Sequence, residues 1–356
     1  MSERNDIRRA LRSVGDDYIA RRPADLSKVR TGVERYRRKR WRAFTGGAVL
    51  AGGAAALLVY FATEAGSPRG PSLPPADRGS LAVVQSVPVG GAPFQVSAKE
   101  DSVWVSRSGG VVARIDVGAV SPAWEEDVAI VPADLIVTGD GVWIADPAKQ
   151  QVIRLDRETG DQLEAVQVGG TPGRITVGSN AIRTTVEGVG VVRIDRGTGD
   201  VTTIYDGNAI DIAMGNTAFW VLGDGAIRPI DPDSGRPVEG IEPIAVPSEG
   251  EITFAREALY HGVDGEDRLL RIDERTGSQT GLISLPGGYE DLDGDSEGVW
   301  LLTQDGAAGQ VLEVDPGTGA IGDTRFEFDE EPVDLVTGAN GVWIALGSGG
   351  RVVLVR

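Results

Sequence analysis

Residues 132–160 read PADLIVTGDGVWIADPAKQQVIRLDRETG, and this stretch contains the pattern that decides the fold. Three apolar runs, at 135–138, 142–145 and 152–155, are separated by turns rich in Gly, Asp and Pro. The runs are too short for helices, and their apolar residues do not recur at helical spacing. The stretch therefore predicts three short antiparallel strands, with a looser fourth strand after them.

The same pattern recurs seven times between residues 81 and 356, at intervals of 37 to 43 residues. A large residue marks each copy, and a second marked position precedes it by eleven residues every time. Because this offset never changes, the repeat is a structural unit and not a bias of composition. The large residues are Trp104, Trp143, Arg183, Trp220, Tyr260, Trp300 and Trp343, and the preceding positions are Pro93, Pro132, Pro172, Ala209, Glu249, Tyr289 and Pro332.

Five of the copies end their third strand on an Asp that is followed four residues later by Gly, as in Asp156 and Gly160. We interpret this Asp-x-x-Thr-Gly pattern as a turn, because an Asp side chain accepts backbone N–H groups and Gly adopts positive φ. The five Asp residues are Asp156, Asp195, Asp231, Asp273 and Asp315.

Seven units of four strands at a period near 40 predict an all-β fold, a seven-bladed β-propeller. The last unit ends after its third strand, at 351–356, whereas residues 84–93 (VQSVPVGGAP) resemble the fourth strand and exit of another unit, 166–172 (VQVGGTP). We therefore expect an N-terminal strand to complete the last blade and close the ring, leaving no exposed edge. The Trp series is expected to pack between blades, because each Trp buries about 150–250 Å².

The composition changes sharply before the propeller. Residues 1–42 carry 14 Arg or Lys against 6 Asp or Glu, a net charge of +8. Because the whole chain has a net charge of −18, the remaining residues carry −26. Residues 43–62 are 20 uncharged residues, long enough to cross a bilayer as a helix. Basic residues precede this span and Tyr60 and Phe61 end it, which places the N-terminus in the cytoplasm and the propeller outside the cell membrane.

The domain organisation that follows is a basic cytoplasmic segment at 1–42, a single-pass transmembrane helix at 43–62, a Pro-rich linker at 63–80 and the propeller at 81–356. A cleaved secretory signal is the competing interpretation of the span, although its charged region would be 42 residues long. Two amphipathic stripes on either side of Pro23 predict a short helical segment that lies on anionic lipid or binds a cytoplasmic protein. No recognition motif for nucleic acid accompanies its charge.

A ring of polar residues is the first candidate site. Nine residues before each large residue, five of the seven copies are acidic at a position near the start of the innermost strand. These side chains either cap the turn that enters the strand or form a binding mouth for a cation or a positively charged ligand. The seven residues are Gln95, Asp134, Arg174, Asp211, Glu251, Asp291 and Asp334.

The second candidate is a metal site in the sixth copy, where the sequence EDLDGDSEG alternates carboxylates around Gly294. Hard oxygen ligands of this kind bind Ca²⁺ or Mg²⁺, although the order differs from an EF-hand loop. The candidate ligands are Asp291, Asp293, Asp295 and Glu297.

The sequence offers little for catalysis. It has no Cys and one His, His261, and it contains no nucleophile elbow, phosphate loop or zinc signature. The absence of Cys also excludes disulfides and a lipoprotein anchor.

The segments GVWIADPAKQQVIRLDRETG (141–160) and GVWIALGSGGRVVLV (341–355) resemble the repeats of bacterial YVTN, NHL and streptogramin-lyase-like β-propellers, over residues 81–356. The resemblance implies the fold, but propellers of this kind serve many functions. Streptogramin lyases are implied to use a His and nearby Glu residues with Mg²⁺, and His261 has no acidic residue two positions before it. The first 62 residues resemble membrane-tethered actinobacterial proteins, some of them anti-sigma-like.

These observations predict a membrane-anchored propeller that binds an extracytoplasmic protein, glycan or small ligand and relays its occupancy to the cytoplasmic segment. A metal-dependent lyase and a structural envelope scaffold are the alternatives.

Overall fold

The structure is a computed structural model that describes residues 81–128, 131–247, 250–255, 257–263, 266–294, 298–305, 308–315, 317–338, 340–347 and 349–356. The segments expected at 1–42, 43–62 and 63–80 lie outside these residues. Within the described part of the chain, no helix is long and apolar enough to cross a membrane.

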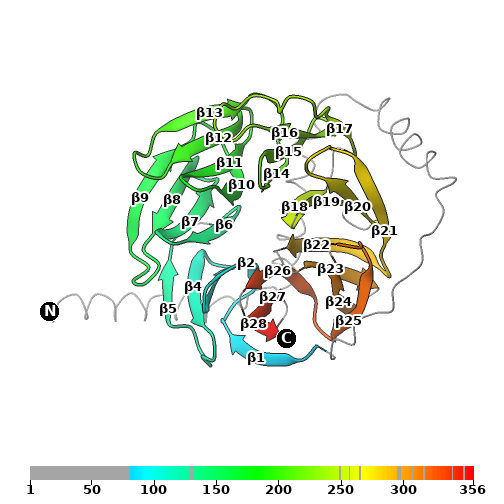
Figure 1. Cartoon of the computed structure of the whole chain (residues 1–356). Coiled ribbons are helices and arrows are strands. Elements are labelled where there is room, and N and C mark those ends of the chain that lie inside the picture. The colour runs from blue at the N-terminus through cyan, green and yellow to red at the C-terminus, as the bar shows by residue number, and fades with distance from the viewer. Residues whose placement is uncertain are drawn as a thin grey trace. The chain divides into compact units, whose positions relative to one another are not determined.

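Seven four-stranded antiparallel sheets are arranged in a ring about a central axis, here called the channel, which confirms the seven-bladed β-propeller (Figure 1). In blades 1 to 6 the strands follow chain order from the channel outward. Blade 1 comprises β2 (Pro93–Lys99), β3 (Ser102–Arg107), β4 (Val111–Asp116) and β5 (Trp124–Asp127); blade 2 comprises β6 (Leu135–Thr138), β7 (Gly141–Asp146), β8 (Gln151–Leu155) and β9 (Gln162–Gln167). Blade 3 comprises β10 (Pro172–Val177), β11 (Ala181–Val186), β12 (Gly190–Asp195) and β13 (Val201–Tyr205); blade 4 comprises β14 (Asp211–Met214), β15 (Phe219–Gly223), β16 (Ala226–Ile230) and β17 (Ile244–Ala245).

The remaining blades follow the same order except for the last strand of blade 7. Blade 5 comprises β18 (Glu251–Ala255), β19 (Ala258–Gly262), β20 (Arg268–Asp273) and β21 (Gln279–Ser284); blade 6 comprises β22 (Gly288–Gly294), β23 (Val299–Asp305), β24 (Ala308–Val314) and β25 (Ile321–Phe328). Blade 7 comprises β26 (Pro332–Gly338), β27 (Gly341–Leu346), β28 (Arg351–Val355) and, as its outermost strand, β1 (Val83–Pro88).

The pairing of β1 with β28 closes the ring, as expected from the sequence. The register sets Val87 opposite Val352, and the ladder continues through the backbone bond from Ala82 N to Arg356 O at 2.8 Å. Val87 is fully buried in the cluster that joins blade 7 to blade 1. The N-terminal strand therefore contributes both hydrogen bonds and core packing to the last blade.

The hydrophobic core of the described residues consists of seven clusters, one at each junction between successive blades. Trp104, Trp143, Trp220 and Trp343 are each at most 2% exposed, and each lies in the cluster between its own blade and the next. The Trp series is thus inter-blade packing, as predicted.

Blade 3 departs from this rule because Arg183 takes the place of Trp. Its side chain is buried, its guanidinium lies 5.6 Å from the ring centroid of Phe219, and Nη2 donates to Pro232 O at 2.7 Å. Its Nε and Nη1 atoms have no hydrogen-bond partner among the described residues. Burial and the nearby Arg193 lower the pKa of Arg183. The junction of blades 3 and 4 is therefore held by a buried charge where the others have an aromatic ring.

The Asp-x-x-Thr-Gly segments form the predicted turns. At the first of them, Asp156 Oδ1 accepts the N–H groups of Glu158 and Thr159, both at 2.8 Å, and these bonds lower the pKa of Asp156. Gly160 has a φ of +77° and donates its N–H to Asp156 O at 2.9 Å.

Candidate functional site at the channel mouth

The seven predicted ring positions lie together at one end of the channel. Strands β2, β6, β10, β14, β18, β22 and β26 are innermost (Figure 1). Each ring residue lies just before its strand or within the first four residues of it. Because successive strands alternate in direction, the hairpins between second and third strands and the connections between blades emerge at this same end. We call this end the channel mouth and its loops the mouth face.

Four of the ring aspartates bridge their blade to the next through the backbone. In three of them, Oδ1 accepts the N–H of the following residue, and in all four, Oδ2 accepts an N–H from the innermost strand of the next blade. The inter-blade distances are Asp134 Oδ2 to Ile175 N, 2.8 Å; Asp211 Oδ2 to Ile252 N, 2.7 Å; Asp291 Oδ2 to Leu335 N, 3.0 Å; and Asp334 Oδ2 to Val96 N, 2.6 Å.

The other three ring residues, Gln95, Glu251 and Arg174, also reach across a blade junction. Gln95 donates Nε2 to Ala133 O at 2.8 Å and to Asp134 Oδ1 at 3.2 Å. Glu251 Oε2 accepts the hydroxyl of Tyr289 at 3.0 Å. All seven positions therefore form one polar ring of inter-blade contacts, in which capping and bridging are combined.

Arg174 is the only cation of this ring. Its Nε lies 3.4 Å from Asp211 Oδ1 on blade 4, and its Nη2 donates to Glu251 on blade 5. Burial lowers the pKa of Arg174, but the carboxylates of Asp211 and of three further ring aspartates raise it by more, so the net shift is upward. One guanidinium thus offsets part of the charge of the five ring carboxylates, which face it from several blades.

The acidic side of the ring lies between blades 6 and 7. Burial and the neighbouring Asp291 raise the pKa of Asp334 well above its ordinary value. Further along β22, burial raises the pKa of Asp293 to about 6, although its Oδ2 accepts both the N–H and the hydroxyl of Thr337, at 2.7 and 2.8 Å. The wall of the channel therefore holds carboxylates that bind protons more tightly than exposed ones.

The predicted metal ligands are only partly described. Asp291 and Asp293 lie on β22 and accept N–H groups from blade 7, whereas Asp295 and Glu297 lie outside the described residues. No group of three His, Cys, Asp or Glu side chains that could hold a metal ion occurs in the part of the chain that the structure describes. The Ca²⁺ or Mg²⁺ site stays a prediction from the sequence.

His261 lies on β19 beneath the ring and is 3% exposed. Its Nδ1 is 3.1 Å from Glu251 O, and because a carbonyl only accepts, Nδ1 carries the proton. Its Nε2 has no partner among the described residues, and burial lowers the pKa of His261 to about 4. The imidazole is therefore neutral near pH 7 and supports the ring from below.

A set of exposed carboxylates on the mouth face was missed by the sequence reasoning. They lie on hairpins and connections of blades 3 to 7. Among the described residues of the mouth face, the exposed cations are Lys149 on blade 2 and Arg268 on blade 5. The exposed carboxylates can be found from the sequence by working out which loops emerge at the mouth end of each blade. The exposed carboxylates are Glu187, Asp206, Asp224, Glu266, Asp267, Asp329 and Glu331.

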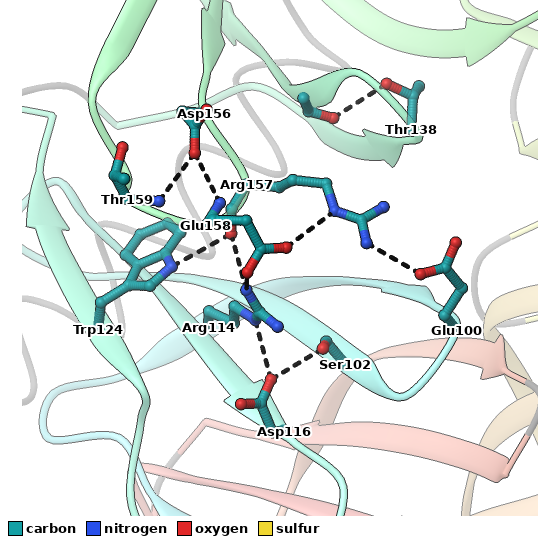
Figure 2. A network of polar contacts seen from close by, with 11 residues as sticks. Glu100, Ser102, Arg114, Asp116, Trp124, Thr138, Asp156, Arg157, Glu158 and Thr159 are labelled. Atoms are coloured by element: carbon teal, nitrogen blue, oxygen red, sulfur yellow. Dashed lines mark hydrogen bonds and ion pairs between the residues drawn. The ribbon is translucent and has the colours of Figure 1, made fainter.

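The opposite end of the blades carries a network of ion pairs between blades 1 and 2. Figure 2 shows Arg157 donating to Glu100 across blades 1 and 2 at 2.9 Å, and Arg114 bridging Asp116 and Glu158 at 2.8 and 2.5 Å. The hydrogen bond to Glu100 raises the pKa of Arg157. Ion pairs also occur at the mouth face, between Arg107 and Glu125 at 2.8 Å and between Arg351 and Glu330.

Comparison with known proteins supports the fold alone. No family model and no curated protein sequence matches this chain. Among solved structures, it is similar to virginiamycin B lyase from Staphylococcus aureus, with 18% identity, a TM-score of 0.63 and coverage of 78% of this chain and 99% of the lyase. BamB from Moraxella catarrhalis is 16% identical, with a TM-score of 0.56 and coverage of 78% of this chain and 98% of BamB. The Pan2 WD40 domain from Neurospora crassa is 10% identical, with a TM-score of 0.60 and coverage of 77% of this chain and 94% of the domain. The fold is thus one that a streptogramin lyase-like enzyme shares with other propeller proteins.

We predict that Arg174→Met destabilises the propeller by about 3–5 kcal/mol, because it leaves Asp211 and Glu251 without their counter-charge. Urea unfolding followed by Trp fluorescence measures the change. Arg107→Met, which removes the partner of the more exposed Glu125, is the control and should cost less than about 1 kcal/mol. Equal effects of the two variants would show that the ring charge is not special.

We also predict a pH effect at Asp293. Its pKa is higher in the folded chain than in the unfolded chain, so its contribution to stability is complete below about pH 4 and is lost as the pH rises through about 6. Asp293→Asn keeps an acceptor for Thr337, so it should gain on the order of 1–2 kcal/mol over the original chain between pH 4.5 and 7.5. Melting curves at several pH values test this, with Asp329→Asn as the exposed control. Parallel curves for all three proteins would contradict it.

Proposed function

We propose that this chain is a membrane-anchored binding module whose propeller docks an extracytoplasmic protein through its mouth face. The proposal rests on the contrast between the ring and the loops around it. Ring carboxylates are bonded to backbone N–H groups and to Arg174, whereas the mouth-face carboxylates project from loops into solvent.

The charge of the mouth face indicates the partner's chemistry. Seven exposed carboxylates surround the mouth, and Arg268, one of the two exposed cations there, lies 3.4 Å from Asp267. A surface with this excess of negative charge attracts a positively charged surface and accelerates its association. We therefore propose a partner that presents Lys or Arg residues, with affinity that falls as the salt concentration rises.

Membrane attachment is part of the same proposal. Residues 43–62 supply an uncharged span, residues 63–80 a Pro-rich linker, and residues 1–42 a basic segment for a cytoplasmic protein or anionic lipid. In this arrangement the acidic propeller and the basic segment lie on opposite sides of the membrane.

The lyase alternative has less support from the site. A histidine-to-alanine variant of virginiamycin B lyase is described as catalytically inactive. In this chain the single histidine, His261, is buried beneath the ring with Nδ1 bonded to a backbone carbonyl. We do not extend the lyase activity to this protein.

The binding face is tested by photo-crosslinking in cells that express the full-length chain. A crosslinking amino acid at Glu187 or Asp267, on the mouth face, should capture the same partner, and capture should decline as salt is raised. The exposed Asp161 and Asp200, at the opposite end of the blades, are the matched controls and should capture little. Equal capture from both ends, or a captured partner without a basic surface, would contradict the proposal.

The topology is tested directly because the chain has no Cys. A membrane-impermeant maleimide should label Ser121→Cys in intact spheroplasts, since Ser121 is exposed on the propeller. It should label Ser13→Cys only after the membrane is permeabilised. Labelling of Ser13→Cys without permeabilisation, or its loss from the mature protein, would contradict the anchored topology.

A further inference from the structure

At the junction of blades 1 and 2, the side chain of Trp124, on the outer strand β5, lies beside the Asp156–Gly160 turn of the next blade (Figure 2). A Cβ on Gly160 would lie only 3.1 Å from the Trp124 ring, and the indole N–H donates to Arg157 O at 3.3 Å. Because Gly160 has no side chain, the Trp124 ring can lie against the backbone of the turn.

The junction of blades 5 and 6 has the same framework without the aromatic ring. In blade 1, Arg114 is paired with Trp124 across strands, and in blade 5 the corresponding pair is Arg271 with Gly281. The turn of blade 6 repeats that of blade 2, with Gly319 at φ +72° donating to Asp315 O at 2.8 Å. Gly281 therefore leaves unfilled the position that the Trp124 side chain occupies in blade 1.

A cavity of about 370 Å³ occupies this position. Its lining includes Arg271, Gly281 and Ile283 of blade 5 and Thr318 and Gly319 of blade 6. The volume falls within the range of about 300–1,000 Å³ that is typical of ligand pockets. The Arg271 side chain is held in place by Thr280 Oγ1, to which its Nη1 donates at 2.8 Å.

We propose that this cavity receives an aromatic side chain, a Trp in the first place, from a segment of the docked protein that extends from the mouth face along the side of blades 5 and 6. Ile283 already covers the turn glycine, since a Cβ on Gly319 would lie 3.5 Å from Ile283 Cδ1. The ring would therefore lie over Gly281, between Ile283 and the guanidinium of Arg271. An arginine next to an aromatic face adds a cation–π attraction, and tryptophan is the best acceptor for it. Buried aromatic anchors of this kind contribute much of the binding energy at protein interfaces.

This inference rests on the proposed protein-binding function, but the cavity is tested without the partner. The probe is 5-fluoroindole, added to the purified full-length chain and followed by ¹⁹F NMR. Binding is expected at concentrations on the order of 1 mM. A second groove of about 430 Å³, between β13 and β16, also offers apolar surface, so variants must assign the signal to one site.

Three variants make that assignment. Gly281→Trp should fill the cavity and weaken probe binding by at least about tenfold. Gly281→Ala is the matched control and should leave binding within about twofold, because its Cβ meets only Arg271 Cβ, at 3.7 Å. Trp124→Gly should open an equivalent site in blade 1 and add a second binding event.

The outcomes separate the cavity from the proposed function. Unchanged binding in a folded Gly281→Trp protein would overturn the inference, and so would a Trp124→Gly protein that binds no additional probe. A photo-crosslinker at Thr280 in the full-length chain should attach to a partner peptide that contains an aromatic residue. Probe binding combined with crosslinks only to peptides without aromatic residues would overturn the choice of occupant, while the mouth-face crosslinks would still report on the docking itself.

Discussion

The inter-blade contact is the interaction on which this structure depends. A four-stranded blade has two faces to cover, and in this chain each face is covered by the neighbouring blade through one of seven hydrophobic clusters. The polar ring adds directed bonds to this non-directional packing. Each ring aspartate accepts an N–H that the next blade would otherwise leave unbonded, so it aligns the two innermost strands as well as attracting them.

This use of carboxylates explains why the channel mouth can be acidic without being unstable. Carboxylates that accept backbone N–H groups and face a guanidinium tolerate burial, whereas unpaired ones would be neutralised by protons. Arg174 provides a counter-charge from blade 3. Asp334 lies beside another carboxylate, that of Asp291, and the pKa of Asp334 is raised by its burial and by this neighbour. The charges left for a partner are then those on the loops, which makes the mouth face a surface for association more than a pocket for chemistry.

The sequence was sufficient for the architecture because a period repeats seven times. One Trp position, one turn and one orphan strand within residues 84–93 predicted the blades, the inter-blade packing and the closure. The function of the ring was harder to predict. Capping and bridging use the same Asp, and nothing in a single repeat tells whether the second carboxylate oxygen reaches another blade. The reach of Arg174 across two blades and the unfilled position at Gly281 depend on three-dimensional register, which a pattern along the chain does not contain.

The closing strand also sets the order of events during synthesis. Val87 pairs with Val352, 265 residues later, so β1 leaves the ribosome long before its partner β28 exists. Loop closure over such a distance adds only a logarithmic entropy cost, but it delays the final contact. Until then, blade 7 lacks its outer strand and β1 exposes its backbone to other chains. Because β28 is the last strand to be made, its ladder with β1 is the one that turns an open array of blades into a ring.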